Sequence, residues 1–290
     1  MHNREGKIMV RYSILIPVYN KLECLKKYFK YIENQTFQNY EIIVVDDCSN
    51  DGSFEYLSEK LKHNNKMKLS RNAINKGVGS VRNTLLSMAT GEYILFVDPD
   101  DYIETSLLEE LDKYCDLDLD IIRYQNVIEP VGEKQISLEN GKNLYRYSCE
   151  VTNVISGEKA LLLWSFGERN INTFPWTYAI KRKIFDGVKY PEISLLEDFA
   201  ITPYLIAKSN KIKAIDYIGY HYLKYDESLS TNSADFALEK LKIFKQVVEL
   251  AKYYISITQI SLQTKELYYN DVENRYNIRE KKVYSKFNKN

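Results

Sequence analysis

The chain has 290 residues, 44% of them hydrophobic, and its 40 basic side chains balance its 40 acidic ones. This hydrophobic fraction is enough for a buried core and excludes general disorder, and the length allows one large domain with a helical extension. A net charge of zero gives the molecule no overall positive field, so we expect no nucleic acid among its partners.

Cysteine usage gives no sign of a metal-binding scaffold. The four cysteines stand far apart, without Cys-x-x-Cys spacing, which argues against a structural zinc site and is typical of a reducing compartment. The apolar run at residues 14–18 is too short for a secretory signal, and no stretch of about 18 apolar residues could cross a bilayer. We therefore expect a cytoplasmic protein.

In the first hundred residues, short apolar runs typical of strands alternate with apolar residues at helical spacing. After a polar, loose N-terminus at 1–11, short apolar runs predict strands at 12–16, 40–45, 67–70 and 93–97. Helices are predicted at 22–32 and 54–61, and from the glycine loop that begins at residue 75 to about residue 89. This alternation is typical of a parallel sheet covered by helices, in which ligands bind at the carboxyl ends of the strands.

Beyond residue 104 the pattern is mixed. We expect helices at 106–114, 156–164 and about 195–207, strands at 121–124 and 212–222, and a polar surface hairpin at 129–149. Beyond residue 233 an apolar stripe predicts helix, namely Phe236, Leu241, Phe244, Val248 and Ile255. The chain accordingly divides into a domain at 12–232, with halves at 12–103 and 104–232, and a helical C-terminal extension at 233–290.

The segment 272–290 carries six basic side chains against two acidic ones, interspersed with aromatic and aliphatic side chains. Such a segment could make peripheral contact with an anionic membrane surface. A solvated tail or a packed helix explains the same composition more simply.

Three carboxylates, Asp98, Asp100 and Asp101, directly follow the apolar run at 93–97. Hard oxygen ligands on a short turn suit Mg²⁺ or Mn²⁺, which share their coordination with waters and substrate phosphates. A turn or a helix N-cap would also place aspartates here. A calcium loop of the EF-hand type does not fit, because Ile103 stands where that loop needs a glycine.

Four sequence blocks occur in a fixed order: ILIPVYN at 14–20, VDDCSNDGS at 45–53, NKGVGSVRN at 75–83 and GEYILFVDPDD at 91–101. Together they resemble the signatures of the family 2 glycosyltransferases, strongly over residues 12–103 and more weakly beyond. The resemblance implies the GT-A fold, an α/β architecture with a Rossmann-like, mostly parallel sheet flanked by helices.

The resemblance also implies how a nucleotide sugar would bind. Asp47 would accept a hydrogen bond from uracil N3–H, beside Asp46, while Tyr19 would lie against the base after the turn at Pro17.

The resemblance assigns the remaining contacts with the nucleotide sugar to residues of the later sequence blocks. The glycine loop with Gly77, together with Arg82 and Asp98, would approach the ribose and diphosphate, since an arginine binds phosphate in a fork. Asp100 and Asp101 would bind Mn²⁺ or Mg²⁺, which stabilises the charge on the leaving diphosphate.

Asp198 resembles the general base of an inverting transferase, which takes the proton of the acceptor hydroxyl as it attacks. Glu197 and Asp198 could also be an acidic helix N-terminus, and the family pattern alone selects Asp198. Glu197 and His221 are further candidates for contacts to the diphosphate or acceptor, and Trp176 for an acceptor sugar platform. For His221 and Trp176, core packing is the simpler explanation.

Three functions compete at this point. The resemblance favours an inverting, metal-dependent glycosyltransferase that uses a nucleotide sugar, with UDP-sugar preferred, and extends capsule or another bacterial surface glycan on a glycan or lipid-linked acceptor. A sugar nucleotidyltransferase would carry a glycine-rich loop after the first strand, and residues 17–21 contain no glycine. A non-catalytic glycan-binding module would lack the full acidic set.

Overall fold

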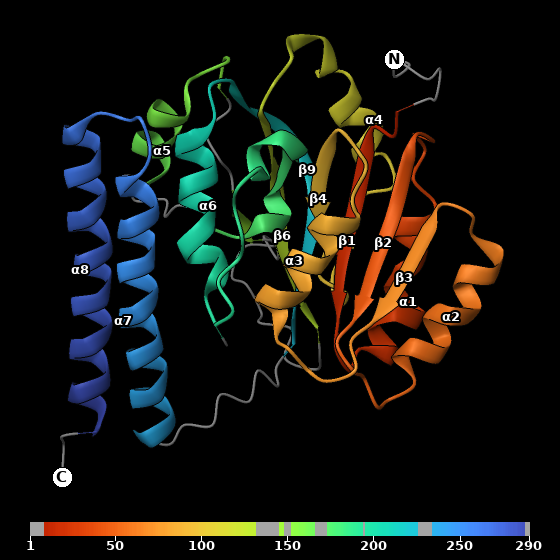
Figure 1. Cartoon of the computed structure of the whole chain (residues 1–290), viewed down its shortest axis with the longest axis horizontal. Helices are drawn as coiled ribbons and strands as arrows, with labels where there is room; N and C mark the ends of the chain where they lie inside the picture. The colour runs from red at the N-terminus through yellow and green to blue at the C-terminus, as the bar shows by residue number, and fades with distance from the viewer. Residues whose placement is uncertain are drawn as a thin grey trace, which may run out of the picture.

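The structure is a computed structural model of the chain, and it describes residues 9–131, 145–147, 152–165, 173–193, 195–225 and 234–287. A central sheet carries helices on both faces, and two long C-terminal helices lie side by side at one flank (Figure 1). The predicted α/β class is confirmed.

The elements of the first hundred residues alternate as the sequence predicts. They are β1 (Tyr12–Val18), α1 (Leu22–Glu33), β2 (Tyr40–Asp46), α2 (Ser53–His63), β3 (Met67–Arg71), α3 (Val78–Met88) and β4 (Tyr93–Phe96). The later strands are β5 (Tyr102–Ile103), β6 (Ile121–Val131), β7 (Tyr145–Tyr147), β8 (Tyr178–Lys181) and β9 (Ile212–Tyr225). The later helices are α4 (Leu107–Asp112), α5 (Gly157–Ser165), α6 (Glu197–Lys208), α7 (Ala234–Ser256) and α8 (Leu262–Phe287), with 3-10 turns η1 (Cys115–Leu117), η2 (Pro175–Thr177) and η3 (Arg182–Phe185).

The strands form one mixed sheet in the order β3-β2-β1-β4-β8-β6-β9-β5, with β7 paired to β6. The pairs within β3-β2-β1-β4 are parallel, whereas β8 runs antiparallel to both of its neighbours. The parallel prediction therefore holds for the first four strands, and β6 and β9 form a further parallel pair. Most of the predicted hairpin at 129–149 lies outside the described residues.

Both faces of the sheet are buried, which explains the continuous apolar runs of the first strands. Every residue of β1 and β2 is buried. Leu15 of β1 points to a core shared with α3, α5, α6, α7 and α8, whereas Ile14 and Ile16 point to a core shared with α1, α2 and α4. Burial on two faces removes the polar alternation of a half-exposed strand.

Helix α7 packs through the predicted apolar stripe, and α8 packs through Tyr268 and Val272. Leu241, Phe244, Val248 and Ile255 are buried; the Phe236 side chain lies outside the described residues. The basic segment continues α8 as far as Phe287, and its first residue, Val272, is buried. Within the described parts of the chain, no helix combines the length and the apolar character needed to span a bilayer.

Helix α3 makes a backbone contact that only glycine allows. A Cβ added at Gly79 would lie 2.3 Å from the carbonyl oxygen of Pro191. We expect Gly79→Ala to lower the free energy of unfolding by about 1–3 kcal/mol, because the helix and the 190–192 segment must separate. Urea denaturation measures this loss. Ser80→Ala on the same helix adds no atoms and serves as the control, and an equal effect of both substitutions would contradict the prediction.

Candidate active site

The carboxyl ends of β1, β2 and β4 lie at the same edge of the sheet, because these strands are parallel neighbours. The arrows of β1 and β2 end at the lower side of the sheet (Figure 1). Residues of the first, second and fourth sequence blocks directly follow these ends. Tyr19 follows β1 and is 48% exposed. The turn after β2 is tied to β1 by a hydrogen bond from the Asp47 amide to the Val18 carbonyl, 2.7 Å long. Lys21, beyond β1, forms an ion pair with Asp100, beyond β4. Three strand ends therefore form one site.

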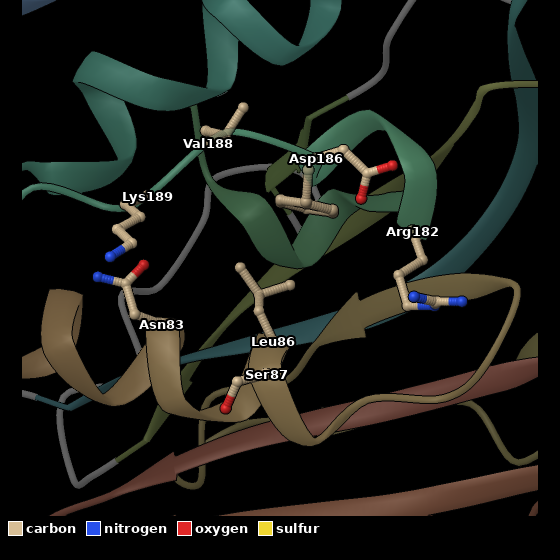
Figure 2. A pocket seen from close by; sticks show the side chains of 8 residues that line it. Asn83, Leu86, Ser87, Arg182, Asp186, Val188 and Lys189 are labelled. Carbon is tan, nitrogen blue, oxygen red and sulfur yellow. The ribbon is translucent and has the colours of Figure 1, made fainter.

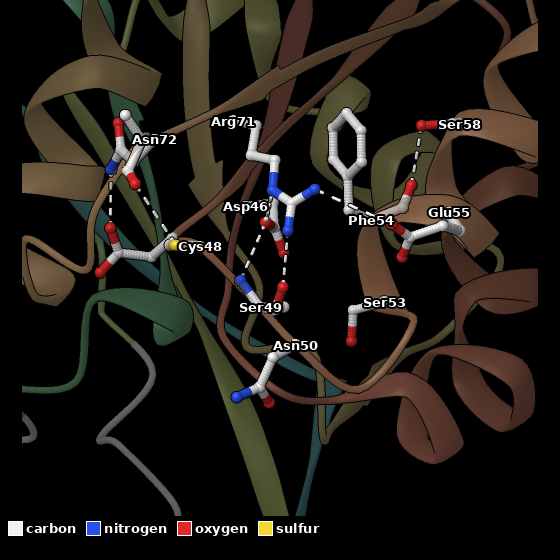
Figure 3. A network of polar contacts seen from close by, with 12 residues as sticks. Asp46, Cys48, Ser49, Asn50, Ser53, Phe54, Glu55, Ser58, Arg71 and Asn72 are labelled. Atoms are coloured by element: carbon white, nitrogen blue, oxygen red, sulfur yellow. Dashed lines mark hydrogen bonds and ion pairs between the residues drawn. The ribbon is translucent and has the colours of Figure 1, made fainter.

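Asp46 holds the turn that follows β2 (Figure 3). Its carboxylate is fully buried, accepts a hydrogen bond from the Ser49 amide at 3.1 Å, and lies 3.2 Å from Arg71 Nε. Arg71 also donates to the Ser49 carbonyl at 2.7 Å, and its guanidinium lies over the ring of Phe54. Asp46 thus faces into the protein, and Arg71 is a partner that the sequence blocks did not reveal.

Asp47 holds the glycine loop against the end of β2. Its carboxylate accepts hydrogen bonds from Asn72 Nδ2 at 2.7 Å and from the amides of Lys76 and Gly77 at 2.9 and 2.8 Å. Gly77 has a φ of +82°, which glycine adopts without strain. A nucleotide base that binds Asp47 would share the carboxylate with this loop, so base binding and loop position are linked.

Asp101 anchors the acidic turn to β9. It is 2% exposed, and its two oxygens accept hydrogen bonds from the Tyr220 hydroxyl at 2.7 Å and the Leu223 amide at 2.8 Å. The Tyr220 oxygen in turn accepts from the Asp98 amide. Both oxygens of Asp101 are therefore engaged inside the protein, and its predicted role as a metal ligand rests on the sequence alone.

Asp98 and Asp100 are the accessible carboxylates of the turn, each about 30% exposed. Burial raises the pKa of Asp98 to about 6, with the charges of Asp100 and Asp198 adding to the rise and that of Arg82 opposing it. Burial, followed by the charge of Asp98, raises the pKa of Asp101 to about 8. A cation bound here would relieve the repulsion among these carboxylates.

The carboxylates of Asp98 and Asp100 are suitable ligands for a divalent cation, but they would supply only part of its coordination. Lys21 Nζ lies 2.6 Å from Asp100 Oδ2, so a cation bound by Asp100 would compete with this ion pair. Across the described residues, no group of three or more candidate metal-ligating side chains occurs. Two aspartate oxygens, with the remaining positions left to water and phosphate, match the coordination that Mg²⁺ prefers.

Arg82 and Glu197 form a buried ion pair, and each side chain is about 5% exposed. The Arg82 guanidinium also lies 3.8 Å from Asp98 and over the rings of Phe96 and Tyr190. The sequence suggests contacts of both residues with the donor or acceptor, but here they bind each other. The pair joins α3, the acidic turn and the start of α6.

Asp198 is the second residue of α6, directly after Glu197, and is half-buried. Burial raises the pKa of its carboxyl group, and the positive charge of Arg82 opposes the rise. Its charge in turn raises the pKa of Asp98, so the two carboxylates are neighbours. A carboxylate with a raised pKa at the edge of the site has the properties of a general base.

The two aromatic candidates from the second half are packed. Trp176 is 3% exposed and stacks between Phe174 and Tyr220. His221 has both ring nitrogens against carboxylates, with Nδ1 2.6 Å from Glu129 and Nε2 2.8 Å from Glu104. Its ring also stacks on that of Tyr102. In both cases the simpler expectation from the sequence, a packed side chain, describes the structure.

A separate hollow of about 230 Å³ lies between α3 and the segment 182–189 (Figure 2). Leu86 and Val188 contribute apolar surface, and Arg182 and Lys189 contribute positive charge. Asn83, the last residue of the third block, lines it, but none of the candidate site residues does, so it is not part of the candidate site.

Comparison with known proteins places the chain among sugar-transferring enzymes. The sequence model described as "Glycosyl transferase family 2" matches residues 13–181, which is more than half of the chain. A poly(ribitol-phosphate) beta-glucosyltransferase of Bacillus spizizenii is 30% identical over 225 residues, which cover 75% of this chain and 33% of the relative. Glycosyltransferase GlyG of Streptococcus pneumoniae is 26% identical over 86% of this chain and 84% of the relative.

Solved structures support the fold. The S. aureus TarS fragment in complex with UDP covers 92% of this chain and 71% of its own, with a TM-score of 0.69 and 23% identity. A mannosyltransferase of Pyrobaculum calidifontis, solved with GDP-Man and Mn²⁺, has a TM-score of 0.54 at 14% identity, over 98% of this chain and 89% of its own. The chain thus spans about a third of the first relative and most of each structural neighbour.

Proposed function

Because this chain belongs to glycosyltransferase family 2, we propose that it is an inverting transferase that moves a sugar from a UDP-sugar to a hydroxyl of a surface glycan or lipid-linked glycan. The observation that carries the proposal is the convergence of Asp98, Asp100 and Asp198 beside the loop that Asp47 holds. The neighbour solved with UDP supports the choice of nucleotide.

Asp98 and Asp100 would hold Mg²⁺ or Mn²⁺ together with the diphosphate, once Lys21 has left Asp100. When bound, the cation would neutralise charge on the leaving diphosphate. Asp47 and Tyr19 would hold the base at the ends of β2 and β1.

Asp198 would take the proton of the acceptor hydroxyl. The hydroxyl oxygen forms a bond to the anomeric carbon as the bond from that carbon to the diphosphate oxygen breaks, and the proton moves to the Asp198 carboxylate. The electron pair of the broken bond leaves with the nucleoside diphosphate. A single displacement of this kind inverts the anomeric configuration without a covalent enzyme intermediate.

The setting that we propose is the cytoplasmic side of the cell membrane. The exposed side chains near the end of α8 include Ile278 and Tyr284 among several lysines and arginines, and this mixture suits contact with anionic lipid. A lipid-linked acceptor would then lie at the same surface.

Calorimetry with UDP tests the donor site directly. We expect binding in the presence of Mn²⁺ that is weakened by a chelator, and a loss of about tenfold or more in Asp47→Ala and Asp100→Ala, because each removes a charged partner of the ligand. Asp116→Ala, an exposed aspartate on η1, is the matched control. If UDP fails to bind with or without Mn²⁺, the proposed donor is wrong.

A further inference from the structure

An ion pair joins the residue that precedes α1 to the acidic turn after β4. Lys21 Nζ lies 2.6 Å from Asp100 Oδ2, and the two side chains are 37% and 30% exposed. Burial lowers the pKa of Lys21, but the charge of Asp100 acts in the opposite direction and raises the pKa above its ordinary value. The side chain is therefore a cation at neutral pH, and Asp100 already has a positively charged partner.

The charge of Lys21 also acts on the second accessible carboxylate of the turn. Burial raises the pKa of Asp98, and Lys21 and Arg82 are the two cations whose charges oppose the rise. Asp98 and Asp100 are the two carboxylates proposed above as ligands of a divalent cation. One lysine thus partly neutralises both of them.

The backbone of Lys21 is held on both sides. Its amide donates to Ser53 Oγ at 3.0 Å, and Ser53 Oγ donates in turn to Asp51 at 2.6 Å, so the residue is attached to the turn that follows β2. Its carbonyl accepts from the Leu25 amide at 2.9 Å as α1 begins. Because the backbone is held, the ammonium group can leave Asp100 only by movement of its own side chain.

This arrangement disfavours metal binding by the protein without a nucleotide. A divalent cation bound by Asp100 would compete with Lys21, and the displaced ammonium could retreat only as far as its side chain reaches, so the two positive charges would repel each other. A nucleoside diphosphate brings negative charge that offsets this repulsion. The cation and the diphosphate should therefore bind cooperatively, and each should raise the affinity for the other by the same factor.

We propose that Lys21 is the counter-ion of the acidic turn in the free protein and that it makes the binding of Mg²⁺ or Mn²⁺ depend on the nucleoside diphosphate. The proposal rests on the donor site proposed above and adds an order of binding to it. In this role Lys21 keeps the turn from binding a cation before the nucleotide sugar arrives.

Titration with Mn²⁺, followed by the electron paramagnetic resonance signal of the free ion, tests the role of Lys21. Lys21→Met removes the charge and keeps an unbranched side chain, so the Kd for Mn²⁺ without nucleotide should fall about tenfold. With saturating UDP the same substitution should change the Kd by about threefold or less, because the diphosphate then offsets the lysine charge. Lys21→Arg keeps the charge and should bind Mn²⁺ as the unmodified protein does.

The controls separate this proposal from the donor site beneath it. Lys26→Met removes an equal charge on α1 that pairs with Glu23, and it should leave the Kd for Mn²⁺ unchanged. The proposal is overturned if Lys21→Met binds Mn²⁺ no more tightly than the unmodified protein, or if the gain is as large with UDP as without it. Failure of the unmodified protein to bind UDP would instead overturn the donor site, and this proposal with it.

Discussion

Replacing Asp198 with asparagine is expected to lower kcat for sugar transfer by about a thousandfold and to leave the Kd for UDP nearly unchanged. Asparagine keeps the shape of the side chain but cannot accept the proton of the acceptor hydroxyl, and general base catalysis contributes roughly 10²–10⁴-fold. Steady-state transfer rates and calorimetry with UDP measure the two quantities separately. Glu192→Gln, at an exposed side chain in the segment before α6, is the control.

The pH profile provides a second readout for Asp198. A general base must be ionised, so kcat should fall as the pH drops through the pKa of Asp198, which burial raises above its ordinary value. That acidic limb should be absent from the residual activity of Asp198→Asn. A variant that retains kcat within tenfold would show that another group takes the proton.

Arg82→Ala is expected to lower the free energy of unfolding by about 3–5 kcal/mol, because it leaves the Glu197 carboxylate buried without its partner. An arginine that only bound substrate phosphate from the surface would contribute little to stability. Urea denaturation of the ligand-free protein distinguishes the two roles. Loss of less than about 1 kcal/mol would contradict the structural role of the pair.

A double variant separates stability from catalysis in this pair. Replacing Arg82 and Glu197 together by methionine removes both buried charges at similar volume, which is often close to neutral for stability. We expect this variant to fold but to transfer sugar slowly. The acidic limb of its kcat–pH profile should move to higher pH, because Arg82 no longer lowers the pKa values of Asp98 and Asp198.

Most of the fold could be predicted because the first strands are buried on both faces and therefore read as apolar runs. β8 could not, since its four residues pair with β4 and β6, which are distant in sequence. β6 extends seven residues beyond its prediction. In this extension the buried polar side chains of Gln125 and Asn126 hide the pattern of a strand.

The chemistry of the site could be predicted to the level of residue types but not of their pairings. Arg82 and Glu197 lie 115 positions apart, and the sequence blocks contain no sign that they meet. Lys21 follows the first block directly, but its contact with Asp100 depends on how β1 and β4 lie in the sheet. The sequence likewise does not show that Trp176 is buried between the rings of Phe174 and Tyr220.

The insertion of β8 between β4 and β6 has a consequence for synthesis of the chain. β4 emerges from the ribosome about eighty residues before β8, so at roughly 5–20 residues per second it waits several seconds with one apolar edge unpaired. Such an edge is a template for pairing with other chains. A fragment that stops at residue 103 would keep this edge permanently, and we expect it to aggregate, whereas a fragment that continues beyond Lys181 can close it.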